Sequence, residues 1–375
     1  MDITDFKSFI EEINKIIDNA LSLKTKALSL KGNEFLFKIK ASDNFKQLTL
    51  RKIERLFNTY KDTDYKNIII EDIEKLFYNT WDGAYSELTA YDMLNLAFDT
   101  PCQIQITDIK KKNTLAKYCY NADVSAIDGY LRDVFMFFEV KTLQTPFIIQ
   151  LNKIKQELEC YNDEEYFTIE SDYPLSLEMK NKDYFALKKE ITKAKKNKLT
   201  HLNSKVVKHL FLKFNYKRKP VTIEYHVCEN SYEMAKRLEQ LPLEDYKQFV
   251  DGKFSKIFVS NGLNSNNSLI CGEKFFRALA RRVFCRLVKV KTIHNGASSK
   301  STSFIAKRLG GLMFVVDISA NTDKLIDNPK DLYKVYFYTN PNATQKNRLF
   351  DIHHFCHYLN RIKTCECDDF VADNY

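Results

Sequence analysis

The sequence predicts an α/β protein with a helical N-terminal region. The first hundred residues place apolar side chains at helical spacing, whereas residues 102–143 form shorter runs rich in β-branched and aromatic residues. After Pro146, helical and strand patterns alternate to the end of the chain. The hydrophobic fraction of 44%, with only 9 Gly and 7 Pro in 375 residues, predicts a packed core and no long flexible linker.

In the first half of the chain, the spacing of apolar residues predicts each helix and strand. Helical spacing predicts helices at Ile3–Leu23, Leu48–Tyr60, Ile68–Tyr78, Ala84–Phe98 and Phe147–Tyr161. Alternation and β-branched content predict strands at Phe35–Ala41, Cys102–Asp108, Leu115–Leu131 and Val134–Leu143. Leu131-Arg-Asp133 is the predicted turn between the last two strands. Residues 84–161 are therefore expected to form a helix, three strands and a helix.

In the second half, the same signals predict alternating helices and strands. The predicted strands are Tyr166–Ile169, Val206–Phe214, Val221–Val227, Lys256–Ser260, Leu312–Ile318 and Tyr333–Tyr338. The predicted helices are Asp183–Lys198, Tyr232–Gln240, Glu273–Val290, Lys300–Leu309 and Asp351–Arg361. Tyr216–Pro220 is the expected turn of one strand pair, and Gly310-Gly311 is expected to end the helix before Leu312.

Positive charge is concentrated in two windows. The net charge is +9, but Lys180–Lys219 carries 14 Lys/Arg against two acids, and Gly272–Gly310 carries ten against one. The remainder of the chain is therefore acidic. This distribution suits a scaffold whose basic surfaces face a polyanion, and solvated helix faces are the alternative.

The sequence predicts an intracellular protein, cytoplasmic or nuclear. Its first residues, Met1-Asp-Ile-Thr-Asp5, have neither the basic segment nor the apolar core of a secretory signal. No apolar stretch approaches the roughly 18 residues needed to span a bilayer, so we expect no membrane association. The 9 scattered Cys are typical of reduced core side chains.

A carboxylate and a lysine emerge together from an apolar strand. In Val134–Leu143, Glu139 and Lys141 are two residues apart and therefore point to the same face. Charges rarely stand unpaired in core strands, so this pair indicates a function or a partner. Asp128 lies eleven residues before Glu139, on the strand expected to pair with it. A hairpin can bring the three side chains to one end of the sheet.

This set of residues is equipped for metal-assisted phosphodiester hydrolysis. Two carboxylates from neighbouring strands make an oxygen-rich site for a hard divalent ion, preferably Mg²⁺. A lysine beside them can orient an attacking water or help neutralise the pentavalent phosphate. The alternative is an ordinary Glu–Lys pair at a strand end with an unrelated Asp in a turn. Asp123 is a second candidate for the Asp role.

The helix upstream offers a third carboxylate. Glu87 is the only charge on a stripe that it shares, at helical spacing, with Ala84, Tyr91, Leu94 and Phe98. A buried carboxylate needs a metal, a hydrogen bond or a cation, and Lys141 or a metal-bound water would serve. The alternative is that Glu87 lies at the edge of the stripe, in solvent.

The order of helix (Glu87), strand, strand (Asp128), strand (Glu139-Val-Lys141) and helix resembles the core of the PD-(D/E)XK, or restriction-endonuclease-like, nuclease superfamily. That superfamily includes type II restriction enzymes, junction resolvases, repair nucleases and phage-defence effectors. The resemblance covers residues 80–161. Ile127 stands where the motif's name has proline, a position that varies in the family. The resemblance implies a central mixed sheet flanked by helices, elaborated by further α/β elements.

Carried over residue by residue, the resemblance makes Asp128 and Glu139 metal ligands, with the Val140 carbonyl as a further ligand. Lys141 becomes the catalytic lysine, and Glu87 matches a helix carboxylate that many members place beside the metal. The implied cofactor is Mg²⁺, for which Mn²⁺ would substitute. Some members also use a glutamine after the catalytic strand, and the candidates here are Gln144, Gln150 and Gln156.

Basic residues in the C-terminal third are the candidate nucleic-acid contacts. The helix Glu273–Val290 is expected to pack one face against the core and to present basic side chains on the other. Asn295–Ser303, which precedes further basic residues, suits either phosphate contact or a plain helix cap. The predicted contacts are Lys274, Arg277, Arg281, Lys300, Lys307 and Arg308.

Four residues near the C-terminus could supply zinc ligands. They are His353, His357, Cys365 and Cys367. Their spacing matches no recognised zinc finger, so a partly buried terminal helix with free thiols is the preferred interpretation and no structural Zn²⁺ is expected.

From these observations we expect three regions in the chain and a nuclease activity. Residues 1–80 would form a helical region, residues 81–230 the nuclease core, and residues 231–375 a basic α/β region for nucleic-acid recognition or dimerisation. The expected protein is a homodimeric, Mg²⁺-dependent endonuclease that hydrolyses double-stranded DNA in restriction or phage defence. The alternatives are a junction-resolving, RNA-cleaving or ligand-activated nuclease on the same core, and a non-catalytic nucleic-acid-binding protein.

Overall fold

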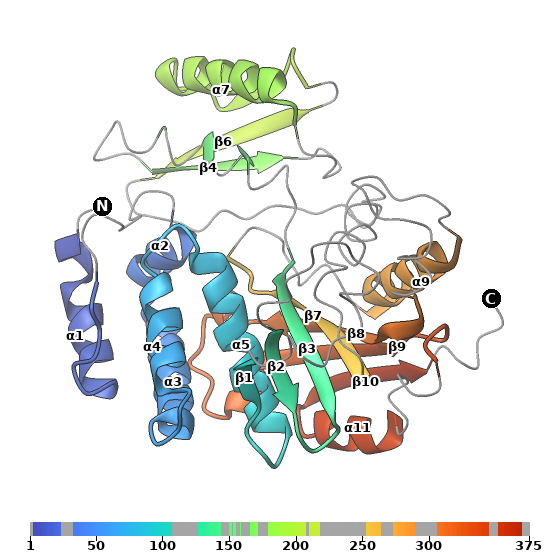
Figure 1. The fold of residues 1–375 in the computed structure, drawn as a ribbon. Helices are drawn as coiled ribbons and strands as arrows, with labels where there is room; N and C mark the ends of the chain where they lie inside the picture. Colours follow the sequence, from blue (N-terminus) through green and yellow to red (C-terminus); the bar gives the residue numbers. More distant parts are fainter. Residues whose placement is uncertain are drawn as a thin grey trace, which may run out of the picture.

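The computed structural model describes most of the chain (Figure 1). The described residues are 3–23, 33–106, 127–143, 150–151, 153–154, 158, 166–171, 179–207, 210–217, 253–263, 273–289, 306–344 and 352–369. Several predictions fall outside these residues. They are the elements at Val221–Val227 and Tyr232–Gln240, the segment Asn295–Ser303, and Asp123, Gln144 and Gln156.

The N-terminal region is helical. A short 3-10 helix, η1 (Ile3–Phe6), leads into α1 (Lys7–Ile16), and the following helices are α2 (Glu34–Ala41), α3 (Asp43–Tyr60), α4 (Lys66–Lys75) and α5 (Trp81–Ala97). Side-chain caps begin two of them. Asn33 Oδ1 accepts a hydrogen bond from the Leu36 N–H at 3.0 Å in α2, and Ser42 Oγ accepts one from the Phe45 N–H at 3.2 Å in α3.

The prediction of a strand at Phe35–Ala41 is wrong, because this segment is helix α2. The alternation of Phe35, Phe37 and Ile39 suggested a half-buried strand. Leu36 is buried as well, so the element is apolar around most of its surface and is enclosed by the core. The Asn33 cap favours the helix over the strand.

The central sheet is mixed, with the strand order β1-β2-β3-β7-β8-β9-β10. Pairs are antiparallel from β1 to β3, parallel from β3 to β8, antiparallel between β8 and β9, and parallel between β9 and β10. The strands are β1 (Gln103–Ile106), β2 (Ile127–Leu131), β3 (Met136–Thr142), β7 (Lys253–Ser260), β8 (Leu309–Asp317), β9 (Tyr333–Thr339) and β10 (Thr364–Asp369). The predicted order of helix, three strands and helix is confirmed by α5, β1, β2, β3 and the helical residues between 150 and 158.

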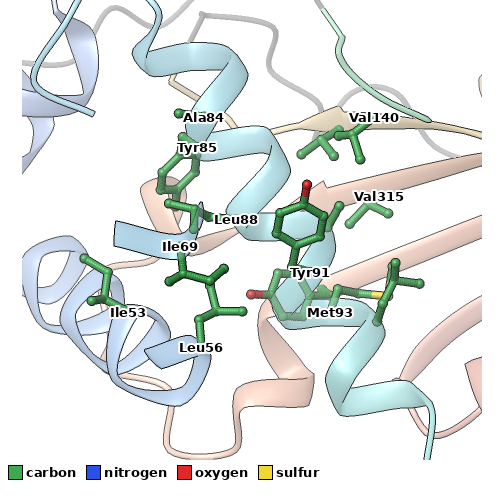
Figure 2. Close-up of a cluster of buried hydrophobic side chains, with 14 of the residues drawn as sticks. Ile53, Leu56, Ile69, Ala84, Tyr85, Leu88, Tyr91, Met93, Val140 and Val315 are labelled. Atoms are coloured by element: carbon green, nitrogen blue, oxygen red, sulfur yellow. The ribbon is translucent and has the colours of Figure 1, made fainter. Parts of the chain in front are cut away.

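Helices cover both faces of this sheet. On one face, α5 packs against β3, where the ring centroids of Tyr91 and Phe138 are 6.4 Å apart. Figure 2 shows α5 between side chains of the N-terminal helices, such as Ile53, and sheet side chains such as Val140. On the other face lies α9 (Glu273–Lys289). Its Phe276 stacks on Phe314 of β8, with the ring centroids 4.6 Å apart. The protein is therefore a mixed α/β fold with a sheet enclosed by helices.

A second, smaller sheet follows β3 in the sequence. Its strands β4 (Tyr166–Ser171), β6 (Phe211–Lys217) and β5 (His201–Asn203) are antiparallel in the order β4-β6-β5, and α7 (Asn181–Lys196) packs on them. Figure 1 shows α7, β4 and β6 together at the top of the view, outside the central sheet. We call this the α7 unit. The turn predicted at Tyr216–Pro220 begins too early, because β6 continues to Lys217.

Two predictions near the C-terminus need correction. Gly310-Gly311 does not end a helix, because residues 306–308 are helical and β8 already begins at Leu309. A Cβ on Gly311 would lie 2.8 Å from the Tyr338 carbonyl oxygen, so a glycine is needed inside this strand. Strand β10 follows α11 (Ile352–Leu359) and was not predicted. No helix in the described residues is long and apolar enough to cross a membrane.

Candidate active site

The β2–β3 hairpin brings Asp128 and Glu139 together. Gly129 pairs with Phe138 and Tyr130 with Phe137, so Asp128 and Glu139 are the next pair in this register. Residues opposite each other in an antiparallel pair point to the same face. Asp128 Oδ2 also accepts a hydrogen bond of 2.6 Å from the Val140 N–H, which fixes the carboxylate against β3.

Lys141 completes the set from the same strand. Its Nζ lies 3.2 Å from Glu139 Oε1, and the two side chains share one face of β3, as their spacing predicts. The Glu139 side chain is only 4% exposed, whereas that of Lys141 is 31% exposed. The lysine therefore reaches from a buried carboxylate toward solvent, where a substrate could meet it.

Helix α5 holds both strands of the hairpin. The Tyr91 hydroxyl donates a hydrogen bond of 3.2 Å to the Asp128 carbonyl oxygen. At the end of β3, the hydroxyls of Ser86 and Thr142 are 2.8 Å apart, and the Thr142 hydroxyl also donates to the Asp82 carbonyl oxygen at 3.1 Å. These contacts fix Asp128 and Lys141 relative to the helix that carries Glu87.

The pKa of Asp128 reflects both its burial and the neighbouring charges. Burial, together with the negative charge of Glu139, raises the pKa of Asp128 to about 7. The hydrogen bond from Val140 and the positive charges of Lys141 and Lys256 oppose it. In the absence of a cation, Asp128 therefore carries a proton for part of the time at neutral pH.

Glu87 lies within electrostatic reach of this pair. It is partly buried, on a helix whose neighbouring stripe positions Ala84 and Tyr91 are buried, so it is not an exposed edge residue. Burial, together with the charges of Asp72 and Asp128, raises its pKa to about 9, and the charge of Lys75 opposes this rise. Gln105 Nε2 donates a hydrogen bond of 3.4 Å to Glu87 Oε2. The raised pKa favours the protonated form of Glu87 at neutral pH.

Lys256 is a buried cation that the sequence analysis missed. It is 0% exposed and pairs with Glu139 in the register of β3 and β7, so the two side chains share a face. A lysine inside the apolar strand Lys253–Ser260 is the same signal that singled out Lys141. Its charge lowers the pKa of Asp128, which indicates that it belongs to the site.

Two charged residues of α4, Asp72 and Lys75, lie within electrostatic reach of Glu87. Asp72 is 0% exposed, and its Oδ1 lies 2.6 Å from Lys75 Nζ. Its Oδ2 is buried and accepts no hydrogen bond from the described residues. Both charges act on the pKa of Glu87, in opposite directions. No motif marked them, because they come from a helix outside the predicted core.

The donor set is suited to a hard divalent ion. Among the residues that the structure describes, no three His, Cys, Asp or Glu side chains form a metal-binding group, so Glu87 is not part of a preformed triad. The candidate ligands are the carboxylates of Asp128 and Glu139 and the carbonyl of Val140. A cation between two carboxylates that raise each other's pKa would remove their repulsion, and oxygen ligands suit Mg²⁺.

Helix α9 lies on the same face of the sheet as Glu139 and Lys141. Lys141 pairs with Phe258, and Phe258 pairs with Phe314, on which α9 packs. As predicted, Leu279 and Val283 are buried on the inner side of α9.

The predicted nucleic-acid contacts differ in exposure. Arg281 and Lys307 are exposed, whereas Arg277 and Arg308 are partly buried. The Lys274 side chain and Lys300 lie outside the described part of the structure.

The remaining candidates have structural surroundings. Gln150 bridges to the α7 unit: its side chain donates to the Met179 carbonyl oxygen at 3.0 Å and accepts from the Met179 N–H at 2.7 Å. The sulfur atoms of Cys365 and Cys367 are 3.7 Å apart on β10. Hydrogen bonds with Cys356 and Cys365 raise the pKa of the Cys367 thiol.

His357 is exposed on α11, and the His353 side chain lies outside the described part of the chain. Comparisons with protein-family models, with curated proteins and with solved structures found no match.

Proposed function

We propose that the chain is a Mg²⁺-dependent endonuclease that hydrolyses DNA phosphodiester bonds, as a restriction or phage-defence enzyme. The observation that carries this proposal is the apposition of Asp128 and Glu139 across one hairpin, with Lys141 Nζ 3.2 Å from Glu139 Oε1 on the same face. Two buried or partly buried carboxylates beside a lysine that reaches toward solvent are the groups that metal-assisted phosphodiester hydrolysis needs.

Each residue has a defined part in this proposal. Asp128, Glu139 and the Val140 carbonyl would hold the divalent ion. A bound Mg²⁺ supplies Lewis-acid polarisation of the phosphate and lowers the pKa of a bound water. Lys141 would orient the attacking water and stabilise the negative charge of the pentavalent phosphate. Glu87, protonated at neutral pH, would hold a proton near the site.

Lys256 has a supporting part. Its buried charge beside Glu139 offsets the repulsion between Asp128 and Glu139 when no metal is bound. The site is thus held together by Lys141 and Lys256 in the metal-free protein. Lys141, whose side chain is 31% exposed, would also be within reach of a substrate phosphate.

The Lys141→Ala variant tests the assignment. Incubated with plasmid in Mg²⁺, the wild type should cut the DNA, and the variant should lose at least 100-fold in rate while still binding DNA. Lys334→Ala is the matched control, because Lys334 lies on β9 of the same sheet, away from the candidate site. Equal cutting by wild type and Lys141→Ala would overturn the site assignment.

The class of nucleic acid that the protein cuts is tested by a second experiment. Plasmid, single-stranded DNA and RNA are each incubated with the wild type in Mg²⁺. Discrete plasmid fragments would support a sequence-specific enzyme, proposed to act as a homodimer because duplex cleavage needs two cuts. Cleavage of RNA but of neither DNA would identify RNA as the substrate. Binding without cleavage in Mg²⁺ or Mn²⁺ would favour a non-catalytic nucleic-acid-binding protein.

A further inference from the structure

The α7 unit presents a lysine-rich face that the candidate active site does not use. Helix α7 buries Tyr184, Leu187, Ile191 and Ala194 against its small sheet, where Leu212 and Phe214 of β6 complete the core. A second stripe, spaced by three, four, four and three residues, runs along the opposite side of the helix. It consists of Lys182, Phe185, Lys189, Lys193 and Lys196, and all five side chains are exposed.

The charge of this stripe is not balanced from within the unit. In the part of the chain that the structure describes, none of its four lysines forms a salt bridge. Glu190, one of the two acids of α7, instead accepts hydrogen bonds from the Ser204 hydroxyl at 2.7 Å and from the Lys205 N–H at 3.0 Å. The stripe is therefore a concentrated positive surface.

The spacing of the stripe matches a linear polyanion. From Lys182 to Lys196 the helix rises about 21 Å, at about 1.5 Å per residue. A DNA strand presents one phosphate per about 3.4 Å of helix axis, so about six phosphates of each strand face this length. Lysine ammonium groups on flexible stems contact phosphates without a fixed geometry, which suits binding that is independent of sequence.

A membrane surface fits this face less well. An interfacial helix needs an apolar face that enters the lipid, but the apolar face of α7 is buried in the unit's own core. Phe185, which is 58% exposed, is the only apolar side chain on the stripe. One aromatic side chain is too little apolar area for insertion, so the polyanion is the better match.

The unit is also connected to the strands that carry the candidate active site. It lies in the sequence between β3, which carries Glu139 and Lys141, and β7, which carries Lys256, and these strands are neighbours in the sheet. The Gln150–Met179 hydrogen bonds tie α7 to the helical residues that follow β3. A second tie is the Lys195 ammonium, which donates to the Leu158 carbonyl oxygen at 2.7 Å.

We propose that the Lys182–Lys196 stripe of α7 binds the phosphate backbone of double-stranded DNA. That this DNA is the substrate of the Asp128/Glu139/Lys141 site rests on the proposed function. The binding surface itself does not. A separate binding surface lets an enzyme hold a duplex before sequence or structure is read at the site.

The test is duplex binding by the full chain at several salt concentrations. The variant K189Q/K193Q/K196Q removes three charges but keeps good helix formers at exposed positions, so folding is preserved. The control K15Q/K61Q/K324Q removes three exposed lysines outside the α7 unit. Fluorescence anisotropy with a labelled duplex of about 30 base pairs, in EDTA to prevent cleavage, gives the dissociation constant at each salt concentration.

The stripe variant should bind at least tenfold more weakly at about 0.1 M salt, and its salt dependence should be shallower by about 2.7 in log–log slope, at about 0.9 per lost phosphate contact. The control should match the wild type. Equal binding by the two triple variants would overturn the proposal. So would tighter binding of single-stranded RNA than of duplex, if the stripe variant lost that binding.

The two proposals can fail separately. If the stripe variant loses duplex binding but Lys141→Ala cuts plasmid like the wild type, the binding surface stands and the active-site assignment falls. If Lys141→Ala is inactive but the stripe variant binds duplex normally, the surface falls and the site stands.

Discussion

The Asp128 carboxyl lies between opposing influences. Burial and the charge of Glu139 raise its pKa to about 7, whereas the Val140 N–H and two lysines lower it. A carboxyl normally titrates near pH 4. The folded, metal-free protein therefore binds a proton at Asp128 under conditions in which the unfolded chain has released it.

This difference makes the stability of the metal-free protein depend on pH. The folded-state pKa is raised, so stability is fully present below about pH 4 and is lost as pH rises toward about 7. In EDTA, the wild type should lose on the order of 2 kcal/mol between pH 4.5 and pH 8 from this group. The Asp128→Asn variant should lose less and be the more stable protein at pH 8. Urea unfolding at both pH values measures the difference.

Asp323→Asn, at an exposed position remote from the site, is the control and should follow the wild-type profile. Adding Mg²⁺ at pH 8 should stabilise the wild type but have little effect on Asp128→Asn, because a ligand stabilises only the folded state that binds it. Parallel stability profiles for wild type and Asp128→Asn would contradict the electrostatic account of the site.

At this scale, sequence reasoning found the residues whose signal is local. Glu139 and Lys141 were found because they are two apart in an apolar strand, and Asp128 because a short turn separates it from them. Lys256 meets Glu139 only through the pairing of β3 with β7, whose sequence positions are far apart. Asp72 acts on Glu87 from another helix. A lysine in an apolar strand marked Lys256 as unusual, but its position in the sequence could not show that it meets Glu139, and nothing in the sequence marked Asp72.

Among the elements, the β2–β3 hairpin is closely packed at Gly129. A Cβ on Gly129 would lie 2.6 Å from the Gln103 carbonyl oxygen and 2.2 Å from Phe138 Cζ. The first of these atoms is backbone and cannot move without shifting β1. Gly129 therefore sets how closely β1, β2 and β3 approach, and with it the position of Asp128.

The Gly129→Ala variant should accordingly be less stable than the wild type by about 1–3 kcal/mol, as expected for overpacking. Gly83→Ala is the matched control. A Cβ at Gly83 meets nothing within 4 Å, and Gly83 lies in α5, so alanine there should add up to about 1 kcal/mol. Urea unfolding gives both free energies. A Gly129→Ala variant as stable as the wild type would show that β1 can shift at no cost.

Helices and strands were predicted correctly where the spacing of apolar residues kept one period along the element. The prediction failed for an element that is buried on both sides. The longer helices and the buried strands were predicted in nearly the right places. Helix α2 was predicted as a strand because its alternating Phe35, Phe37 and Ile39 conceal a helix enclosed by the core. Strand β10 was not predicted because its sequence, Thr-Cys-Glu-Cys-Asp-Asp, has one β-branched residue and no aromatic residue, so only its pairing with β9 identifies it as a strand.

At the scale of the whole molecule, buried polar networks join segments from all three predicted regions. Lys52 Nζ of α3 lies 2.6 Å from Asp317 Oδ2 of β8, and it also donates to Thr89 of α5 at 2.9 Å. Beside it, Arg55 and Tyr333 both donate to Asp92 of α5. The N-terminal helices are thus bound to the far side of the same sheet that carries the candidate site.

The Lys52–Asp317 pair is expected to govern the stability of the whole fold. Both side chains are at most 2% exposed, and burial of Asp317 is tolerated because Lys52 and Ser319 stabilise its charge and lower its pKa. Lys52→Met should cost about 3–5 kcal/mol, because it leaves a buried carboxylate without its cation. Adding Asp317→Asn should recover part of that loss. Unfolding in urea, followed by the fluorescence of Trp81 and by circular dichroism, measures both effects.

The control for that experiment is Lys46→Met, which breaks a partly exposed salt bridge instead of a buried one. Lys46 Nζ lies 2.5 Å from Glu12 Oε1, but the two side chains are 19% and 32% exposed, so breaking this pair should cost about 0–1 kcal/mol. In the wild type, the fluorescence and circular dichroism transitions should coincide, because the helices and the sheet share one core. Similar small losses for Lys52→Met and Lys46→Met, or two separate transitions in the wild type, would mean that the N-terminal helices are stable independently of the sheet.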